Sequence, residues 1–169
     1  MGLKPILFVP DPLLRKMASP VEEITNDIKQ LLDDMAQTMY DAPGIGLAGP
    51  QIGELKRVIV MDCSRDEDGD ELWQMINPEI IQIAKETTTL EEGCLSIPGH
   101  NADVTRPAWV DVRFTDINGT EQQMKAEGLL AACVQHEIDH LNGVLFIDHI
   151  SKLKKNMIWR KVLKEVRHS

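Results

Sequence analysis

Apolar residues recur at helical intervals in one segment near the start of the chain. The positions that carry them lie one, three or four residues apart: Ile28, Leu31, Leu32, Met35 and Met39. This spacing places them on one face of an α-helix, so the pattern predicts an amphipathic helix over residues 26–41. Before it, the apolar stretch Leu3–Val9 predicts a short strand or an extended arm that Pro10 and Pro12 end.

The middle of the chain shows the two-residue alternation of strands. Val110, Val112 and Phe114 alternate with more polar positions, which is typical of a half-buried strand. The Asn118-Gly119 pair that follows favours a tight turn into an antiparallel partner. Shorter β runs are expected at residues 58–61, around residues 72–76 and at residues 80–84.

Helical spacing returns toward the end of the chain. It predicts one helix over residues 127–141 and a last, basic helix over residues 153–166, whereas residues 44–53 are expected to form a glycine-rich loop. Antiparallel strands in the middle of the chain, with helices on both sides, indicate an α+β domain.

Length and composition favour a single globular domain. The chain has 169 residues, of which 43% are hydrophobic and 27% charged, the balance of an ordinary folded protein. The longest apolar run near the start, Ile6–Val9, is too short for a signal peptide or a membrane span. Three widely spaced cysteines do not form a disulfide framework and suit a reducing compartment. We therefore expect a cytoplasmic protein with one domain over residues 1–169.

The charge is distributed unevenly along the chain. A net charge of −9 argues against a protein that wraps DNA or coats an anionic membrane. Residues 152–169, however, contain seven Lys or Arg and a single acidic residue, Glu165. We expect an acidic body over about residues 1–150 and a basic helix over residues 151–169, in which neighbouring cations pair with Glu165. The acidic stretch Asp66–Glu71 is expected to be a solvated loop tip.

The strongest chemical signal is a His-Glu-x-x-His motif in the helix predicted over residues 127–141. His136 and His140 lie one helical turn apart on one face, so both imidazoles can reach one divalent metal. Glu137 lies beside the first histidine, where it is not needed as a ligand and can take a proton from water.

The metal needs a third ligand from outside this helix. Phe146 occupies the position at which the longer metzincin motif has its third histidine, and Glu165 lies among basic residues. Cys133 is seven residues from His140, about 10 Å along the helix, which is too far for the two side chains to share a metal with His136.

A second motif, Glu92-Gly93-Cys94-Leu95-Ser96, can supply the missing ligand. A thiolate from Cys94 would complete a Cys-His-His site and leave one coordination position open, as a catalytic metal requires. The main-chain N–H of Leu95 would then lie beside the metal, where it could face a developing oxyanion.

The third motif is the glycine-rich segment Gly44–Gln51. It contains the letters of a dinucleotide-binding fingerprint, but a helix precedes it and a β run follows, which reverses the strand-loop-helix order of that fingerprint. The glycines more plausibly let the backbone run close past a substrate. Gln51 adds a neutral side-chain donor that can polarise a carbonyl.

Taken in order, the three motifs resemble those of peptide deformylases, and the resemblance covers about residues 1–150. It implies an α+β fold with antiparallel sheets packed around a central helix that carries the histidine pair, followed by a C-terminal helix. It also implies an activity: hydrolysis of the formyl group from the N-terminal formyl-methionine of newly made proteins, with release of formate.

The resemblance also implies roles for individual residues. One divalent metal is expected, Fe²⁺ foremost, with Zn²⁺, Ni²⁺ or Co²⁺ as alternatives. The implied metal ligands are Cys94, His136 and His140. Glu137 would be the acid/base, Gln51 and the Leu95 N–H would hold the formyl oxygen, and Gly46 would line the site. The residues implied for the methionine pocket are Ile45, Leu90, Leu129 and Cys133.

This chain departs from the family pattern near the expected path of the substrate backbone. Many members carry an arginine three residues after the proline of the second motif. Asn101 stands at that position here, and Arg106 follows five residues later. The resemblance therefore predicts how the chain binds the peptide beyond the methionine less well than it predicts the reaction.

Two other functions share part of the pattern. A zinc endopeptidase would use the same His-Glu-x-x-His chemistry on internal peptide bonds. A non-catalytic metal-binding module would close the site with a fourth ligand, for which Asp148 and His149 are the nearest candidates, whereas His100 is expected to be a surface loop residue. The basic helix could contact the ribosome, as the resemblance implies for some bacterial members, or pack on the acidic body.

Overall fold

The computed structural model describes residues 2–64 and 71–167. In this part of the chain the α-helices are α1 (Asn26–Asp41), α2 (Gly128–Leu141) and α3 (Lys152–Arg167). The strands are β1 (Gly46–Ala48), β2 (Val58–Met61), β3 (Trp73–Ile83), β4 (Thr87–Cys94), β5 (Ile97–Pro107), β6 (Trp109–Thr115) and β7 (Glu121–Glu127). Short 3-10 helices are η1 (Pro12–Arg15), η2 (Gly49–Ile52) and η3 (Phe146–His149).

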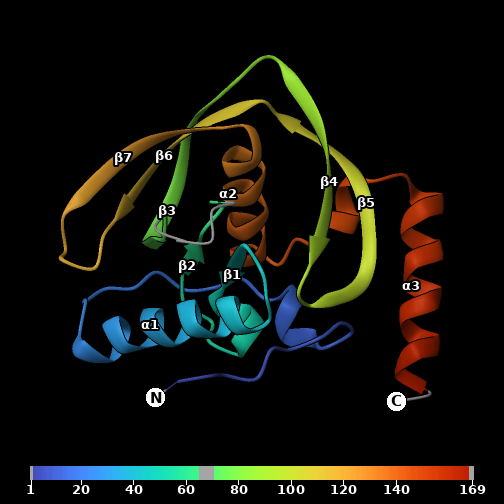
Figure 1. The fold of residues 1–169 in the computed structure, drawn as a ribbon, viewed down its shortest axis with the longest axis horizontal. Helices are drawn as coiled ribbons and strands as arrows, with labels where there is room; N and C mark the ends of the chain where they lie inside the picture. The colour runs from blue at the N-terminus through green and yellow to red at the C-terminus, as the bar shows by residue number, and fades with distance from the viewer. Residues whose placement is uncertain (1, 65–70, 168–169) are drawn as a thin grey trace.

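The strands form two antiparallel sheets around α2. One has five strands in the order β1-β2-β3-β6-β7, and the other is the β4–β5 hairpin. In Figure 1, α2 stands between the two sheets, α1 lies across one end, and α3 lies outside the β4–β5 hairpin. The predicted α+β fold, with a central helix and a C-terminal helix, is confirmed.

Helix α1 occupies the range that its apolar spacing predicts. The Thr25 hydroxyl accepts a hydrogen bond from the Ile28 amide (3.3 Å) and so caps the first turn. The apolar face of α1 packs against the five-stranded sheet, chiefly on Leu47, Val58 and Val60. This contact forms one hydrophobic core.

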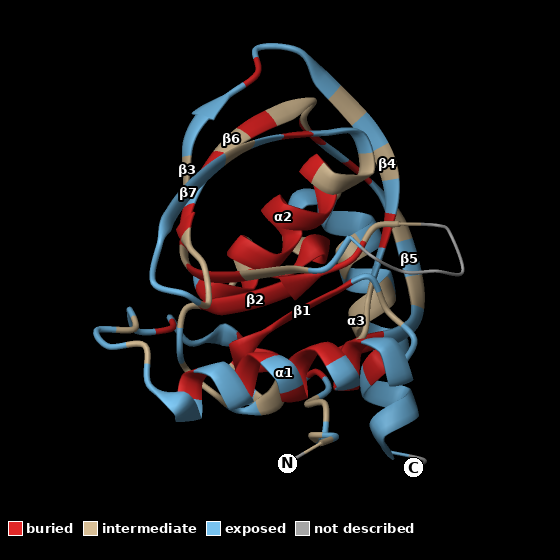
Figure 2. Cartoon of the chain, turned by 60° about the vertical axis from the view of Figure 1, so that its left-hand side comes forward, coloured by how far each residue is buried: buried red, intermediate tan, exposed pale blue. Residues whose placement is uncertain are grey.

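Helix α2 is buried on nearly all sides, as its red colour in Figure 2 shows. It follows β7 directly, and Gly128 makes the turn with a positive φ of 58° that favours glycine. A second core lies between α2 and the sheet and includes Ile59, Val112 and Val134. The surroundings of its polar residues are therefore largely apolar.

Helix α3 packs on a third core beside β5. Val162 is buried there with Ile97 and Phe146. The expected pairing of Glu165 with neighbouring cations is wrong: its carboxylate lies 3.1 Å from His100 Nε2, whose side chain is only 11% exposed. His100 is thus a mostly buried residue of β5, because the helix covers it, and not a surface loop residue.

The strands differ from the sequence prediction in three places. The runs expected around 72–76 and at 80–84 form one strand, β3, with an irregularity at Asn77, whose φ is 52°. The glycine-rich loop contains β1, since residues 46–48 pair with β2. Strands β4 and β5 were not predicted, because buried positions such as Glu92 and Arg106 are charged and interrupt the apolar alternation.

Two further sequence predictions concern the N-terminal segment and the acidic stretch. The segment Leu3–Val9 is an extended arm, held where the Leu7 amide donates to the Gln51 carbonyl (2.7 Å). Residues 65–70, most of the acidic stretch, lie outside the described residues. In the described part of the chain, none of the helices has the length and apolar character needed to cross a membrane.

Candidate metal centre and active site

Three side chains with metal-binding atoms meet where the end of β4 touches α2. The Nε2 atoms of His136 and His140 are 3.3 Å apart, and the Cys94 Sγ is 3.3 Å from His140 Nε2. Two nitrogen ligands of one tetrahedral metal, each bonded at about 2.1 Å, would lie roughly 3.4 Å apart. The spacing and chemistry of Cys94, His136 and His140 therefore fit one divalent metal.

The other candidate ligands have partners elsewhere. His149 Nε2 lies 2.8 Å from Asp139 Oδ2, and Asp148 pairs with Arg15 and Lys155. Among residues 2–64 and 71–167, the group of potential ligands therefore has three members and includes neither Asp148 nor His149. A three-ligand site leaves one coordination position open for substrate or water. A catalytic metal requires such an open position, whereas a structural metal has all its positions filled by protein ligands.

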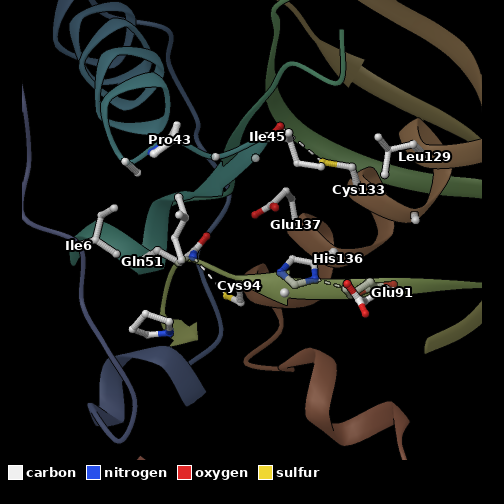
Figure 3. A pocket seen from close by; sticks show the side chains of 18 of the residues that line it. Ile6, Pro43, Ile45, Gln51, Glu91, Cys94, Leu129, Cys133, His136 and Glu137 are labelled. Carbon is white, nitrogen blue, oxygen red and sulfur yellow. Dashed lines mark hydrogen bonds and ion pairs between the residues drawn. The ribbon is translucent and has the colours of Figure 1, made fainter. Parts of the chain in front are cut away.

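Glu137 lies in the same cavity wall as the cluster but is not one of its ligands (Figure 3). Its side chain is buried, and its Oε1 atom has no hydrogen-bond partner among the described residues. Burial raises the pKa of Glu137 to about 7. A carboxyl group with a pKa near 7 can both accept and return a proton near neutral pH.

The position of the Glu137 carboxylate depends on Gly46. A Cβ atom at Gly46 would overlap Glu137 Oε2. The glycine predicted to line the site thus leaves the space that the Glu137 carboxylate occupies, and a side chain at position 46 would displace this carboxylate.

Gln51 is buried and its amide is oriented by the main chain. Its Oε1 accepts a hydrogen bond from the Ala48 amide (2.9 Å), which turns Nε2 toward Ser96 Oγ (3.1 Å) and Cys94 Sγ (3.6 Å). The N–H donors of Gln51 therefore point to the thiol side of the cluster, as Figure 3 shows.

A cavity of about 720 Å³ surrounds these groups. Of the residues predicted for the site, those that line it are Ile45, Gly46, Gln51, Cys94, Leu95, Leu129, Cys133, His136 and Glu137. His140 belongs to the cluster but is not among the lining residues. Leu90 is not among the lining residues, although it is half-buried on the face of β4 that also carries Glu92 and Cys94.

A buried ion-pair network behind the cluster was not predicted. Glu92 Oε1 lies 3.0 Å from His136 Nδ1, and both Glu92 oxygens accept from the Arg106 guanidinium at 2.7 and 2.9 Å. Burial alone would raise the pKa of Glu92, but the bonds from His136 and Arg106 outweigh it and lower the pKa to about 2. Glu92 thus orients the outer nitrogen of a ligand histidine.

A sequence signal for Glu92 exists. It lies two residues before Cys94, and residues two apart in a strand share a face. Using that signal requires knowing that this segment is a strand.

Arg106 is not among the residues that line the cavity. Its side chain is buried, and its NH1 group also donates to Asp139 (2.9 Å). Asn101, by contrast, pairs across the hairpin with Gly93, which lines the cavity. The arginine that follows Asn101 by five residues is thus engaged with two carboxylates, those of Glu92 and Asp139.

The extended arm also contributes to the cavity, which sequence reasoning missed. Ile6 and Phe8 line it, and Figure 3 shows Ile6 on the side away from Leu129 and Cys133. Their apolar character was visible in the sequence, but the arm reaches the site only through tertiary contacts.

Comparison with known proteins places this arrangement in a family. The family model described as "Polypeptide deformylase" matches residues 3–156. The chain is 53% identical over 164 residues to the peptide deformylase of Rhizobium meliloti, covering 97% of this chain and 94% of the relative. It belongs to the peptide deformylase family.

Solved structures agree with this assignment. A peptide deformylase from Legionella pneumophila superposes with a TM-score of 0.89 at 45% identity, covering 98% of this chain and 96% of that one. One from Ehrlichia chaffeensis, in complex with actinonin, gives 0.90 at 42% identity, covering 98% of each chain.

As a peptide deformylase, the protein is a metalloenzyme, a hydrolase that removes the formyl group from the N-terminus of newly made proteins. An endopeptidase or a non-catalytic metal-binding module is not supported.

Proposed function

We propose that Cys94, His136 and His140 hold one divalent metal, Fe²⁺ foremost, with Zn²⁺, Ni²⁺ and Co²⁺ as alternatives. Thiolate and imidazole ligands accept each of these ions, so availability and geometry select among them. When bound, the metal supplies Lewis-acid activation of water and of the formyl carbonyl. The close approach of the three ligand atoms supports this assignment.

The methionine side chain of the substrate enters the apolar part of the cavity. Ile45, Leu129 and Cys133 form its walls, and Leu90 stays a predicted member of this pocket. An unbranched thioether fills such an irregular apolar space well. Gly46 leaves room for the substrate backbone to pass next to β1.

The formyl oxygen is held between Gln51 and the Leu95 N–H. The fixed orientation of the Gln51 amide supports this role, since a donor that is already aimed costs no reorganisation during the reaction. As the formyl carbon becomes tetrahedral, its oxygen gains negative charge and these donors bind it more tightly.

Glu137 moves the proton. Its carboxylate takes a proton from the attacking water and returns it to the methionine nitrogen as the C–N bond breaks. Formate and a free amino terminus result. The observation that carries this proposal is the buried Oε1 of Glu137 beside the cluster, which has no hydrogen-bond partner within residues 2–64 and 71–167.

The test compares Glu137→Gln with the wild-type enzyme on a formyl-methionyl tripeptide. Loss of a general acid/base is expected to lower kcat by about 10²–10⁴-fold, while metal content, measured on the same samples, stays at one ion per chain. Near-normal turnover by a fully loaded Glu137→Gln variant would remove Glu137 from this role.

We further propose that the enzyme is cytoplasmic, acts as one domain over residues 1–169, and contacts the ribosome through its basic helix. Exposed lysines on α3, among them Lys154 and Lys161, support an anionic partner such as ribosomal RNA.

Deletion of residues 153–169 is expected to abolish salt-sensitive co-sedimentation with ribosomes. Turnover of the free formyl-methionyl tripeptide should be retained. Co-sedimentation that survives the deletion would overturn the ribosome proposal.

A further inference from the structure

Two cysteines have no role in the metal cluster, and the fold brings them together. Cys63 follows the end of β2, and Cys133 lies seventy residues later on α2. Both pack in the same hydrophobic core, Cys133 buried and Cys63 half-buried. The two cysteines are therefore close in the tertiary structure although they are far apart in the sequence.

One carbonyl oxygen connects the two segments. The Ile45 oxygen accepts from the Asp62 amide (2.9 Å), immediately before Cys63, and from the Cys133 thiol (3.6 Å). The Cys133 thiol also interacts with the Cys63 sulfur. Figure 3 shows the Cys133 sulfur directed at Ile45, on the cavity wall.

The two thiols differ in reactivity. The hydrogen bond from Cys133 lowers the pKa of Cys63, whereas that bond and burial raise the pKa of Cys133. Cys63 is also the more accessible of the two. An oxidant arriving from solvent would therefore meet the more nucleophilic sulfur first.

We propose that Cys63 and Cys133 are a modification site that a peroxide converts to a disulfide. Hydrogen peroxide oxidises the Cys63 thiol to a sulfenic acid and is reduced to water. The Cys133 sulfur then attacks the Cys63 sulfur, the S–O bond breaks, and the oxygen leaves as a second water with the Cys133 proton. A dithiol reductant reverses the change by exchange.

The modification would alter substrate binding, a consequence that rests on the proposed placement of the methionine side chain. Cys133 lines the cavity. A bond to Cys63 would move the Cys133 sulfur and remove the thiol proton that Cys133 donates to the Ile45 carbonyl. The pocket proposed for the methionine side chain would therefore change shape. A change of about one methylene group in an apolar pocket corresponds to roughly tenfold in kcat/KM.

The test uses enzyme loaded with Zn²⁺, which has no redox chemistry of its own. The protein is treated with limiting hydrogen peroxide, alkylated and digested with trypsin without reduction. The three cysteines fall on separate tryptic peptides, Val58–Arg65, Glu86–Arg113 and Ala126–Lys152. The first and third should appear linked. Linkage of the first to the second, or oxidation of Cys63 without linkage, would overturn the proposal.

Kinetics provide the second readout, with Cys63→Ser as the matched control. Peroxide should lower kcat/KM for a formyl-methionyl tripeptide about tenfold in the wild type, and dithiothreitol should restore it. Cys63→Ser should not respond. Equal responses of the two proteins would overturn the link to substrate binding. A disulfide that forms without a kinetic change would instead contradict the proposed placement of the methionine side chain. If Cys63→Ser fails to fold, peptide mapping of the wild type still tests whether the disulfide forms.

Discussion

At the residue scale, Gly46 shows how one absent side chain leaves room for the Glu137 carboxylate. Any Cβ there would overlap the Glu137 carboxylate, which lies in a buried and crowded space. The carboxylate can therefore occupy its position beside the metal ligands only while residue 46 lacks a side chain. The glycine is thus a geometric requirement of the acid/base role that we propose for Glu137.

We predict that Gly46→Ala lowers kcat by about 100-fold. The added methyl group would displace the Glu137 carboxylate, and a displacement of about 1 Å in a reacting group can lower the rate by about this factor. Steady-state kinetics on a formyl-methionyl tripeptide measure this. The double variant Gly46→Ala/Glu137→Gln is the control. If the alanine acts through Glu137, the double variant should be no slower than Glu137→Gln alone; additive losses would show an independent effect.

At the element scale, the β4–β5 hairpin and α2 together form the metal site. The hairpin contributes Cys94 as a proposed ligand and Glu92 as the partner of His136. Arg106 on β5 pairs with Glu92 within the hairpin, and the contacts Arg106–Asp139 and Glu92–His136 join the hairpin to α2. Pairs of this kind define register and position more than they add stability.

A second set of ion pairs connects the elements around η3. Asp148 Oδ1 lies 2.7 Å from Lys155 on α3, and Asp148 also pairs with Arg15 on η1 and accepts from the Leu145 amide. Burial raises the pKa of Asp148, but these partners outweigh it and hold the pKa well below its ordinary value. The charged form thus stabilises the junction of three elements.

We predict that Asp148→Asn lowers the free energy of unfolding by about 1–2 kcal/mol at pH 7, after allowance for partial exposure. A lowered folded-state pKa means that this stabilisation is complete above the ordinary carboxyl pKa of about 4 and is lost as the pH falls through lower values. Urea unfolding at pH 7 and near pH 3 measures the difference between the two proteins, which should shrink at the lower pH.

The control for this prediction is Glu54→Gln. Glu54 forms an exposed pair with Lys56 (3.0 Å), in which both side chains are more than 40% exposed. Its removal should change stability by less than about 0.5 kcal/mol. A pH-independent loss in Asp148→Asn would show that packing, and not charge, is responsible.

At the scale of the whole molecule, a bound metal would join segments that are far apart in the chain. Its proposed ligands come from the β4 end and from α2, more than forty residues apart. Binding to the folded state alone stabilises it in proportion to the logarithm of metal concentration. The metal is therefore expected to contribute to folding as well as to chemistry.

We predict that removing the metal with a chelator lowers the free energy of unfolding by about 3 kcal/mol, relative to enzyme with free metal at 100 times its Kd. For a chain of this size the Tm should fall by roughly 5–10 °C, as calorimetry would measure, and Zn²⁺ should restore it. An unchanged Tm would show that the metal does not bind the folded chain in preference to the unfolded one.

Much of the site could be predicted without coordinates. The spacing of His136 and His140 implies a shared face because helical geometry is local, and the apolar spacing of α1 predicts its bounds for the same reason. Cys94 was found because its surroundings and the limits on Cys133 left a ligand to be supplied from another segment. These inferences depend on short-range geometry or on chemistry that one residue carries.

What the sequence determined by itself is the set of chemical groups and the local helices, since both depend on nearby residues. The tertiary structure decided which charges are buried and which segments meet. Glu92 and Arg106 are buried together as an ion pair, and the Ile45 carbonyl connects Asp62, the neighbour of Cys63, with Cys133. Such contacts join residues distant in the chain, and their free energy depends on burial, which no local pattern of residues specifies.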